Sequence, residues 1–108
     1  MNHLARAEAM ARRVLVSEPS DAAAAIISSV YRKRGRPREA LDFSAKFLPS
    51  NNPALLTSRA AAMLDVGEPE EALKLVSRAY AIAKNIGASL DEVSRVYRRL
   101  KKEHGLGP

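Results

Sequence analysis

The heptapeptide Gly35-Arg36-Pro37-Arg38-Glu39-Ala40-Leu41 returns 32 residues later as Gly67-Glu68-Pro69-Glu70-Glu71-Ala72-Leu73. Both copies read Gly-x-Pro-x-Glu-Ala-Leu. A fixed period of this length is typical of stacked supersecondary units, in which each unit buries its apolar face against the next. The sequence therefore predicts a repeat architecture.

Each copy predicts a tight turn between two antiparallel helices. Glycine supplies the left-handed backbone that commonly closes a helix. Proline two residues later cannot continue that helix but fits the first turn of a new one. The glutamates that follow complement the dipole of the new helix. Ala40 and Ala72 are small enough to let two helices cross closely, so each copy indicates an αα-hairpin.

Helical periodicity extends over most of the chain. Apolar residues recur at spacings of three and four, turn residues separate the periodic segments, and no segment alternates with a period of two. The expected helices span about 2–17, 21–34, 37–48, 54–66, 69–85 and 90–103. Ser20 or Asp21 is expected to cap the second helix, and Ser89 with Glu92 to form a capping box at the last.

The first helix is expected to bury one apolar stripe and to serve as a cap. Its charged residues Arg6, Glu8, Arg12 and Arg13 are expected to face outward. The residues expected on the buried stripe are Leu4, Ala7, Met10, Ala11, Val14 and Leu15.

A second pair of similar segments indicates how the helices group into units. Residues 28–33 read Ser-Ser-Val-Tyr-Arg-Lys, and residues 94–99 read Ser-Arg-Val-Tyr-Arg-Arg, close to two periods later. The last helix therefore resembles the first helix of a hairpin. The prediction is a leading half-unit, two full hairpins and a closing half-unit.

Two-helix units of about 32 to 34 residues resemble tetratricopeptide repeats. The resemblance covers residues 2 to 103, although no tryptophan opens either unit and Arg59 stands where an apolar residue is usual. The matching residues are Tyr31, Gly35 and Ala40 in the first unit and Leu56, Ala60, Gly67, Ala72 and Ala79 in the second.

The resemblance implies an all-α, right-handed superhelical solenoid of about six helices, whose first helices line a concave groove for a peptide or a partner helix. Members that grip the free carboxylate of a chaperone tail use a Lys and Asn pair, but Ala25, Ser29, Thr57 and Ala61 stand at those positions. The groove residues implied by the resemblance are Ala25, Ile26, Ser29, Arg32, Lys33, Thr57, Ser58, Ala61, Leu64, Arg95, Arg98 and Arg99.

The basic residues have an ordinary interpretation, as solvated helix ends whose cations offset the helix dipole, and a functional one, as a surface for an acidic partner. The formal net charge is +6, with basic clusters over 32–38 and 95–102. An acidic protein segment is the preferred partner. Nucleic acid, RNA above all, is the alternative, less favoured because no RNA-module signature or aromatic stacking platform accompanies the charge. A homodimer is a third interpretation.

Composition narrows the class further. The 108 residues, 46% hydrophobic and 28% charged, predict a single domain over 1–108. No apolar run approaches the roughly 18 residues that cross a bilayer. The first 13 residues lack the apolar region of a secretory signal. Their arginine-bearing pattern resembles a mitochondrial transit peptide weakly and an ordinary helix more closely. We expect no membrane association and a cytoplasmic location.

Catalytic patterns are missing from the sequence. There is no cysteine, which excludes disulfides, thiol catalysis and cysteine-ligated metals. The two histidines, His3 and His104, stand near the chain ends, and no zinc-protease, phosphate-loop or EF-hand pattern occurs. We therefore expect no catalytic residue, metal or cofactor, and a non-catalytic adaptor for protein–protein interaction.

Overall fold

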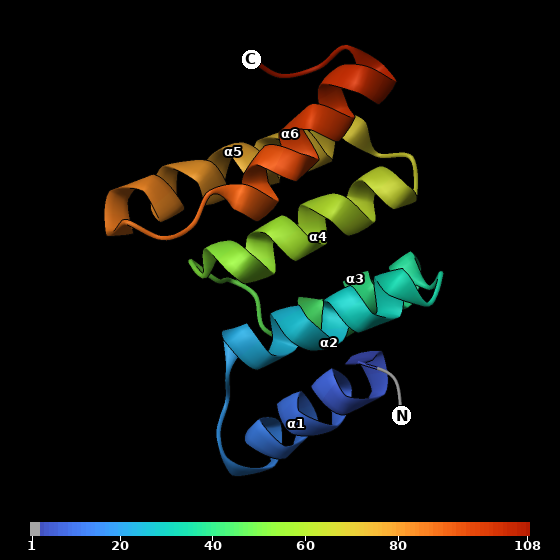
Figure 1. Ribbon diagram of the computed structural model, residues 1–108, viewed down its shortest axis with the longest axis vertical. Helices are drawn as coiled ribbons and strands as arrows, with labels where there is room; N and C mark the ends of the chain where they lie inside the picture. The colour runs from blue at the N-terminus through green and yellow to red at the C-terminus, as the bar shows by residue number, and fades with distance from the viewer. Residues whose placement is uncertain (1–2) are drawn as a thin grey trace.

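The computed structural model describes residues 3–108, and every regular element in that range is a helix (Figure 1). The prediction of an all-α chain with six helices is confirmed for these residues. The expected first residue of the first helix, residue 2, lies outside the described range. The helices are α1 (His3–Ser17), α2 (Asp21–Lys33), α3 (Pro37–Ala45), α4 (Pro53–Asp65), α5 (Pro69–Ile86) and α6 (Asp91–His104).

The two Gly-x-Pro turns adopt one backbone conformation. Gly35 and Gly67 have φ of 76° and 83°, the left-handed region that glycine enters without strain. The residue after each glycine donates its N–H to the carbonyl five residues back: Arg36 to Tyr31 at 2.9 Å and Glu68 to Met63 at 2.8 Å. These bonds satisfy carbonyls that the helix end leaves free. Pro37 and Pro69 then begin α3 and α5, as predicted.

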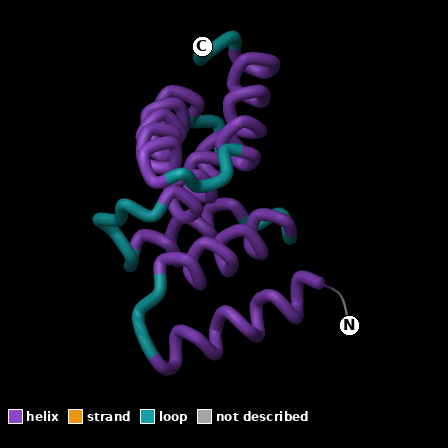
Figure 2. Tube along the Cα trace, turned by 60° about the vertical axis from the view of Figure 1, so that its left-hand side comes forward, coloured by secondary structure: helices purple, strands orange, loops and turns teal. Residues whose placement is uncertain are grey.

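The helices form two rows. In Figure 1, α1, α2, α4 and α6 follow one another in front, with α3 and α5 behind, and Figure 2 shows α1 at one end of the stack. Consecutive helices contact each other, and α2 also contacts α4, as α4 does α6. In the described part of the chain the backbones of α3 and α5 do not approach each other closely. The front row is therefore the more closely packed of the two.

α4 lies at the centre of the core. Adjacent residues Leu55 and Leu56 are both fully buried, and they serve different clusters. Leu56 belongs to a cluster shared by α4, α5 and α6 that includes Val76, Val93 and Leu100. Leu55 packs with alanines of α2 and with the half-buried Phe43 and Phe47. The core is thus continuous in the C-terminal half and divided in the N-terminal half.

α3 ends three residues earlier than the sequence suggested. Lys46, Phe47 and Leu48 donate their N–H groups to carbonyls three residues back, so the chain tightens after Ala45. Pro49 disfavours helical backbone at the residue before it, which explains the early end. Arg59 occupies the space beside this turn: its guanidinium donates to Leu41 O at 2.9 Å and to Ser44 Oγ at 2.6 Å.

The predicted caps give one confirmation and one correction. Ser20 caps α2, because its side chain accepts the N–H of Ala23 at 3.0 Å. The expected capping box at α6 does not form. Leu90 takes the cap position, the Ser89 hydroxyl accepts only the N–H of Asp91 at 3.3 Å, and Arg95 holds the Glu92 carboxylate at 2.9 Å.

The expected buried stripe of α1 is also corrected. Ala11 is buried and Leu4, Ala7 and Leu15 are half-buried, but Met10 is 66% and Val14 41% exposed. Among the helices, α1 has only α2 as a close backbone neighbour, so the arc of its surface that is covered is narrow. Its acidic residue turns inward as well: Glu8 accepts from Arg12 at 2.9 Å and from Arg34 of the α2 end at 2.7 Å.

Candidate functional site

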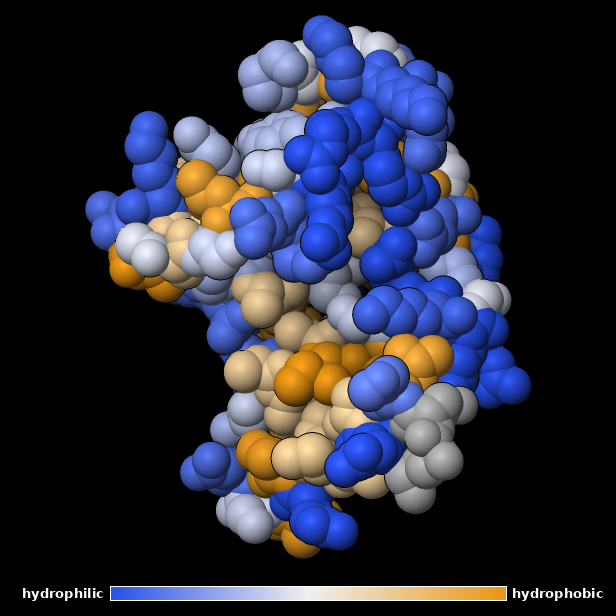
Figure 3. Space-filling model, viewed as in Figure 1, coloured by the Kyte–Doolittle hydropathy of each residue, from blue (hydrophilic) through white to orange (hydrophobic). Residues whose placement is uncertain are grey.

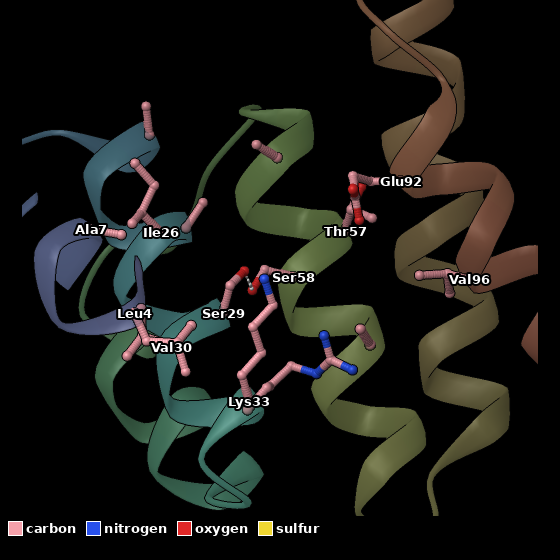
Figure 4. Close-up of a pocket in the computed structure, with 15 residues that line it drawn as sticks. Leu4, Ala7, Ile26, Ser29, Val30, Lys33, Thr57, Ser58, Glu92 and Val96 are labelled. Atoms are coloured by element: carbon pink, nitrogen blue, oxygen red, sulfur yellow. Dashed lines mark hydrogen bonds between the residues drawn. The ribbon is translucent and has the colours of Figure 1, made fainter. Parts of the chain in front are cut away.

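A groove of about 470 Å³ opens on the front row, between α1, α2, α4 and α6. α2 and α4 form its floor, Leu4 and Ala7 of α1 form one wall, and Glu92 and Val96 of α6 form the other (Figure 4). On this face apolar side chains gather over α2 and the adjoining part of α1, whereas hydrophilic ones gather over α6 (Figure 3). The groove is therefore an apolar surface with a charged border.

Small side chains make the floor shallow and methyl-rich. Ala25 and Ala61 line it with only 6% of each residue exposed, while Ile26 is 45% exposed at its edge. An apolar residue exposed to this degree inside a hollow is an available contact for a ligand.

The hydroxyl groups in the groove already have partners. The oxygens of Ser29 and Ser58 lie 3.3 Å apart and share a hydrogen bond between α2 and α4, drawn in Figure 4. Thr57 Oγ1 donates to the carbonyl of Pro53 at 2.6 Å. These polar side chains tie the floor together, so the surface that remains for a ligand is mostly methyl groups.

One carboxylate beside the groove, outside its lining, joins arginines of α2 and α6. Asp65 of α4 accepts from Arg32 of α2 at 2.7 Å and from Arg99 of α6 at 3.0 Å. Arg99 also pairs with Glu103 at 3.1 Å, and these two acidic partners raise the pKa of its guanidinium, Glu103 first. An acidic residue at a helix C-terminus opposes the helix dipole. Asp65 is instead stabilised by the arginines that it joins across three helices.

The two basic clusters, over 32–38 and 95–102, therefore come together only in part. Arg32 and Arg99 meet, but on Asp65. Lys33 lies across the groove in Figure 4 and has no ion pair within residues 3–108. It is the cation in the groove that remains available to a ligand carboxylate.

The structure brings most of the expected groove residues together. Their role in binding stays a prediction. Those that line the groove are Ala25, Ile26, Ser29, Arg32, Lys33, Thr57, Ser58 and Ala61.

Four expected residues lie elsewhere. Leu64 is 5% exposed and belongs to the core beneath α4, because it stands on the face of the helix that meets α5 and α6. Arg95, Arg98 and Arg99 border a separate hollow on α6 together with Lys102 and Glu103. The closing helix thus reaches the groove through Glu92 and Val96 rather than through its arginines.

The sequence reasoning missed the wall from α1, and from α6 it predicted the arginines rather than Glu92 and Val96. The helical spacing of Leu4 and Ala7 predicts a packed face and does not by itself indicate a groove wall. A half-unit whose missing partner leaves an apolar edge uncovered is the signal that pointed to them.

Two further features, a metal site and a membrane span, are absent from the described residues. Within residues 3–108, no group of three or more His, Cys, Asp or Glu side chains is placed to hold a metal ion. None of the described helices combines the length and apolarity that a membrane span requires.

A scan against models of known protein families found no match, and searches of curated proteins and of solved structures found no similar protein.

Proposed function

We propose that this chain is a non-catalytic protein-interaction module that holds a peptide or helix of a partner protein in the groove of α1, α2, α4 and α6. The observation that carries the proposal is the groove itself: an apolar floor whose hydroxyls are bonded internally, with the unpaired Lys33 at one end. Concave apolar surfaces with a few placed polar groups are the usual sites of ligand binding.

The proposed architecture is a short right-handed superhelix of the tetratricopeptide type. The two turns with one conformation support equivalent hairpins. The close backbone contacts of α4 with both α2 and α6, with none between α3 and α5 in the described chain, support a stack that curves toward the groove face. Arg59 departs from the family pattern but finds acceptors in Leu41 and Ser44, so this departure fits the packing.

The groove favours binding over catalysis. Its hydroxyl side chains bond to one another or to backbone, and none of the residues that line it is a histidine or cysteine. A nucleophile needs an adjacent base within hydrogen-bonding reach, but these hydroxyls bond to one another or to backbone rather than to Lys33 or Glu92, the lining residues that could act as a base. The absence of cysteine from the sequence also fits the proposed cytoplasmic location.

The test is loss of a captured partner when the groove is charged. Ile26 and Ala54 are exposed and line the groove, so Ile26→Glu with Ala54→Glu adds carboxylates without burying them. Ala25 and Ala61 are unsuitable because they are nearly buried. The control is Ala81→Glu, at an exposed position of α5 away from the groove.

The partner is identified first by affinity capture with the unaltered chain and then remade in pure form. We expect the groove variant to lose that purified partner, the control to keep it, and both to keep the helical circular dichroism spectrum. Binding that survives Ile26→Glu with Ala54→Glu would show that the groove is not the site.

A second candidate function, nucleic-acid binding, has one observation in its favour. Arg95, Arg98 and Lys102 stand on the side of α6 opposite its buried residues, and Arg98 and Lys102 have no ion pair in the described chain. Each phosphate that such cations neutralise releases counterions, so binding would fall steeply with salt. Titration with single-stranded and duplex oligonucleotides at about 50 mM salt tests it, and a flat titration rejects it.

A further inference from the structure

The leading helix α1 has an apolar surface that the fold leaves uncovered. Met10 is 66% exposed and Val14 is 41% exposed. Ala7, three residues before Met10, lines the groove. Residues at i, i+3 and i+7 lie on one side of a helix, so Ala7, Met10 and Val14 share a face. The apolar surface of the groove therefore continues along α1 toward its C-terminal end.

α2 supplies the facing wall of this extension. Only three residues separate α1 from α2, and the two helices run antiparallel and in contact. Figure 4 shows Ala7 beside Ile26 and Leu4 near Val30. Ala22 and Ile26 are exposed on α2, one turn apart. Together the two helices present an apolar surface that extends the groove, which we call the α1–α2 cleft: Ala7, Ala22 and Ile26 line the groove, and the exposed Met10 and Val14 continue its apolar surface along α1.

The shape of this cleft fits a helix better than an extended strand. An added strand gains its affinity from main-chain hydrogen bonds to an exposed sheet edge. Within residues 3–108 there is no strand and hence no such edge. An amphipathic helix needs only an apolar groove for its apolar face, and it satisfies its own backbone. Methionine suits such a surface, because its flexible thioether adapts to the ligand.

The charges beside the cleft define the flanks of that helix. Arg6 and Arg13 are exposed, lie four residues before and three residues after Met10, and take part in no ion pair in the described chain. Lys33 is unpaired at the end of the groove on α2. Arg12, by contrast, is already paired with Glu8. Unpaired cations along α1 and at one end of the groove complement carboxylates on the ligand.

A second copy of this chain is a poor occupant by the same reasoning. Docking α1 on α1 would place Arg6 and Arg13 near the same two cations of the partner. The outer side of α6 is basic as well, through Arg95, Arg98 and Lys102. Like charges brought together across an interface oppose association, and each copy carries a formal net charge of +6.

From this cleft and its cations we infer that the partner of the groove is an amphipathic helix with an apolar stripe and acidic flanks, and that it lies along α1 as well as α2. This inference rests on the proposed function and names the partner class. It makes α1 half of the binding surface rather than a cap.

The first experiment uses three synthetic peptides of one length and the full chain. The probe peptide carries leucines at i, i+3, i+4 and i+7 on an alanine background, with glutamates on both flanks of the stripe. One control has the same composition in scrambled order, and the other has lysines in place of the glutamates. Fluorescence anisotropy is expected to show the probe binding at least about tenfold more tightly than either control, a difference of about 1.4 kcal/mol. Equal binding of the scrambled peptide would show that net charge alone accounts for the binding, and it would overturn the inference.

The second experiment places the site on α1. Met10→Glu with Val14→Glu is expected to weaken binding of the probe about tenfold or more. The matched control is Val16→Glu, since Val16 is 87% exposed on the same helix but lies on another side, and it is expected to change nothing. Circular dichroism checks that all three proteins remain folded.

The outcomes separate this inference from the proposed function. If Ile26→Glu with Ala54→Glu loses the captured partner while Met10→Glu with Val14→Glu keeps it, the groove function stands and the α1–α2 cleft is wrong. If sedimentation shows a dimer that the Met10 and Val14 changes convert to a monomer, the cleft is a self-association surface and the inference is overturned.

Discussion

The two halves of this molecule share a turn and differ in what surrounds it. Gly35 and Gly67 have φ of 76° and 83°, and the hydrogen bonds that follow them are equivalent. Around the second turn, one continuous cluster joins α4, α5 and α6. Around the first, the buried side chains form two smaller clusters. The heptapeptide thus fixes the backbone of the turn, and the residues beyond it decide how deeply the helices pack.

The difference follows from particular residues. α3 ends at Ala45, whereas α5 runs to Ile86, so the first hairpin offers a shorter apolar stripe. The half-buried Phe43 packs against both N-terminal clusters, and Lys46 lies 5.4 Å from the centre of its ring. Both halves line the groove, but the less deeply packed half supplies most of the lining residues, from α1 and α2. We therefore expect the C-terminal half to dominate stability and the N-terminal half to dominate recognition.

The largest predicted effect compares Leu55→Ala with Leu56→Ala. Both residues are fully buried on α4, and each points into a different half. Buried leucine truncations cost about 2–5 kcal/mol, and the cost is greater where the site cannot collapse. We expect Leu56→Ala to fall near the top of this range and Leu55→Ala near the bottom, because Phe43 and Phe47 are half-buried and can move.

Urea denaturation followed by circular dichroism measures both variants. Equal losses for Leu55→Ala and Leu56→Ala would mean that the two cores are equally rigid. The comparison between the halves would then fail at its main point.

The next effect tests the helix crossings. Ala40 and Ala72 occupy the same place in the two copies of the heptapeptide and are 1% and 0% exposed. Replacing either by leucine forces extra methylenes into a packed site, at about 1–3 kcal/mol. We expect the larger loss of unfolding free energy at Ala72, which lies inside the continuous cluster. A larger loss at Ala40 would show that the crossing itself, rather than the cluster around it, limits the packing.

Replacing the glycine of each turn is expected to cost the two halves the same stability. A methyl group added at Gly35 or Gly67 meets no atom within 4 Å, so the cost of alanine there is confined to the left-handed backbone. That conformation costs an L-residue about 1–2 kcal/mol. Thermal denaturation of Gly35→Ala and Gly67→Ala is expected to give matching losses of stability. A clear difference would show that the turns are equivalent in shape but not in strain.

Much of the fold was readable because helix signals are local. The Gly-x-Pro turns, the cap at Ser20 and the helical spacing each depend on a few neighbouring residues, and the structure confirms them. The position of Arg59 and the failed capping box depend on more distant or competing groups, whereas the early end of α3 follows from the nearby Pro49. Arg59 reaches back to Leu41 and Ser44, and Arg95 takes the carboxylate of Glu92.

The sequence predicted residues on the floor of the candidate site but not those at its borders. Ala25 and Ala61 line the groove at positions that the resemblance to tetratricopeptide repeats implied. The exposure of Met10 does not follow, since helical spacing alone cannot say how wide an arc of α1 its neighbours cover. Nor does spacing show that Arg32 and Arg99 meet on Asp65, because that contact joins three helices.

The smallest predicted effect concerns the ion pairs that hold α1 to the first hairpin. Glu8 accepts from Arg12 and Arg34, and these two bonds lower the pKa of its carboxyl below the ordinary value of 4.5. A carboxyl with a lowered pKa adds stability above its ordinary pKa, and that stability is lost as the pH falls through the folded value.

We therefore expect Glu8→Gln to lose about 1 kcal/mol or less near pH 7. This loss should shrink toward zero when denaturation is repeated at lower pH, where the wild-type carboxyl is protonated too. Glu103→Gln is the counterpart in the C-terminal half. Arg99 lowers the pKa of Glu103, yet Arg99 keeps Asp65 when Glu103 is removed, so this change is expected to matter less. A Glu8→Gln deficit that is the same at both pH values would mean that α1 is held by its apolar stripe alone, and the N-terminal half would then depend on packing as fully as the C-terminal half does.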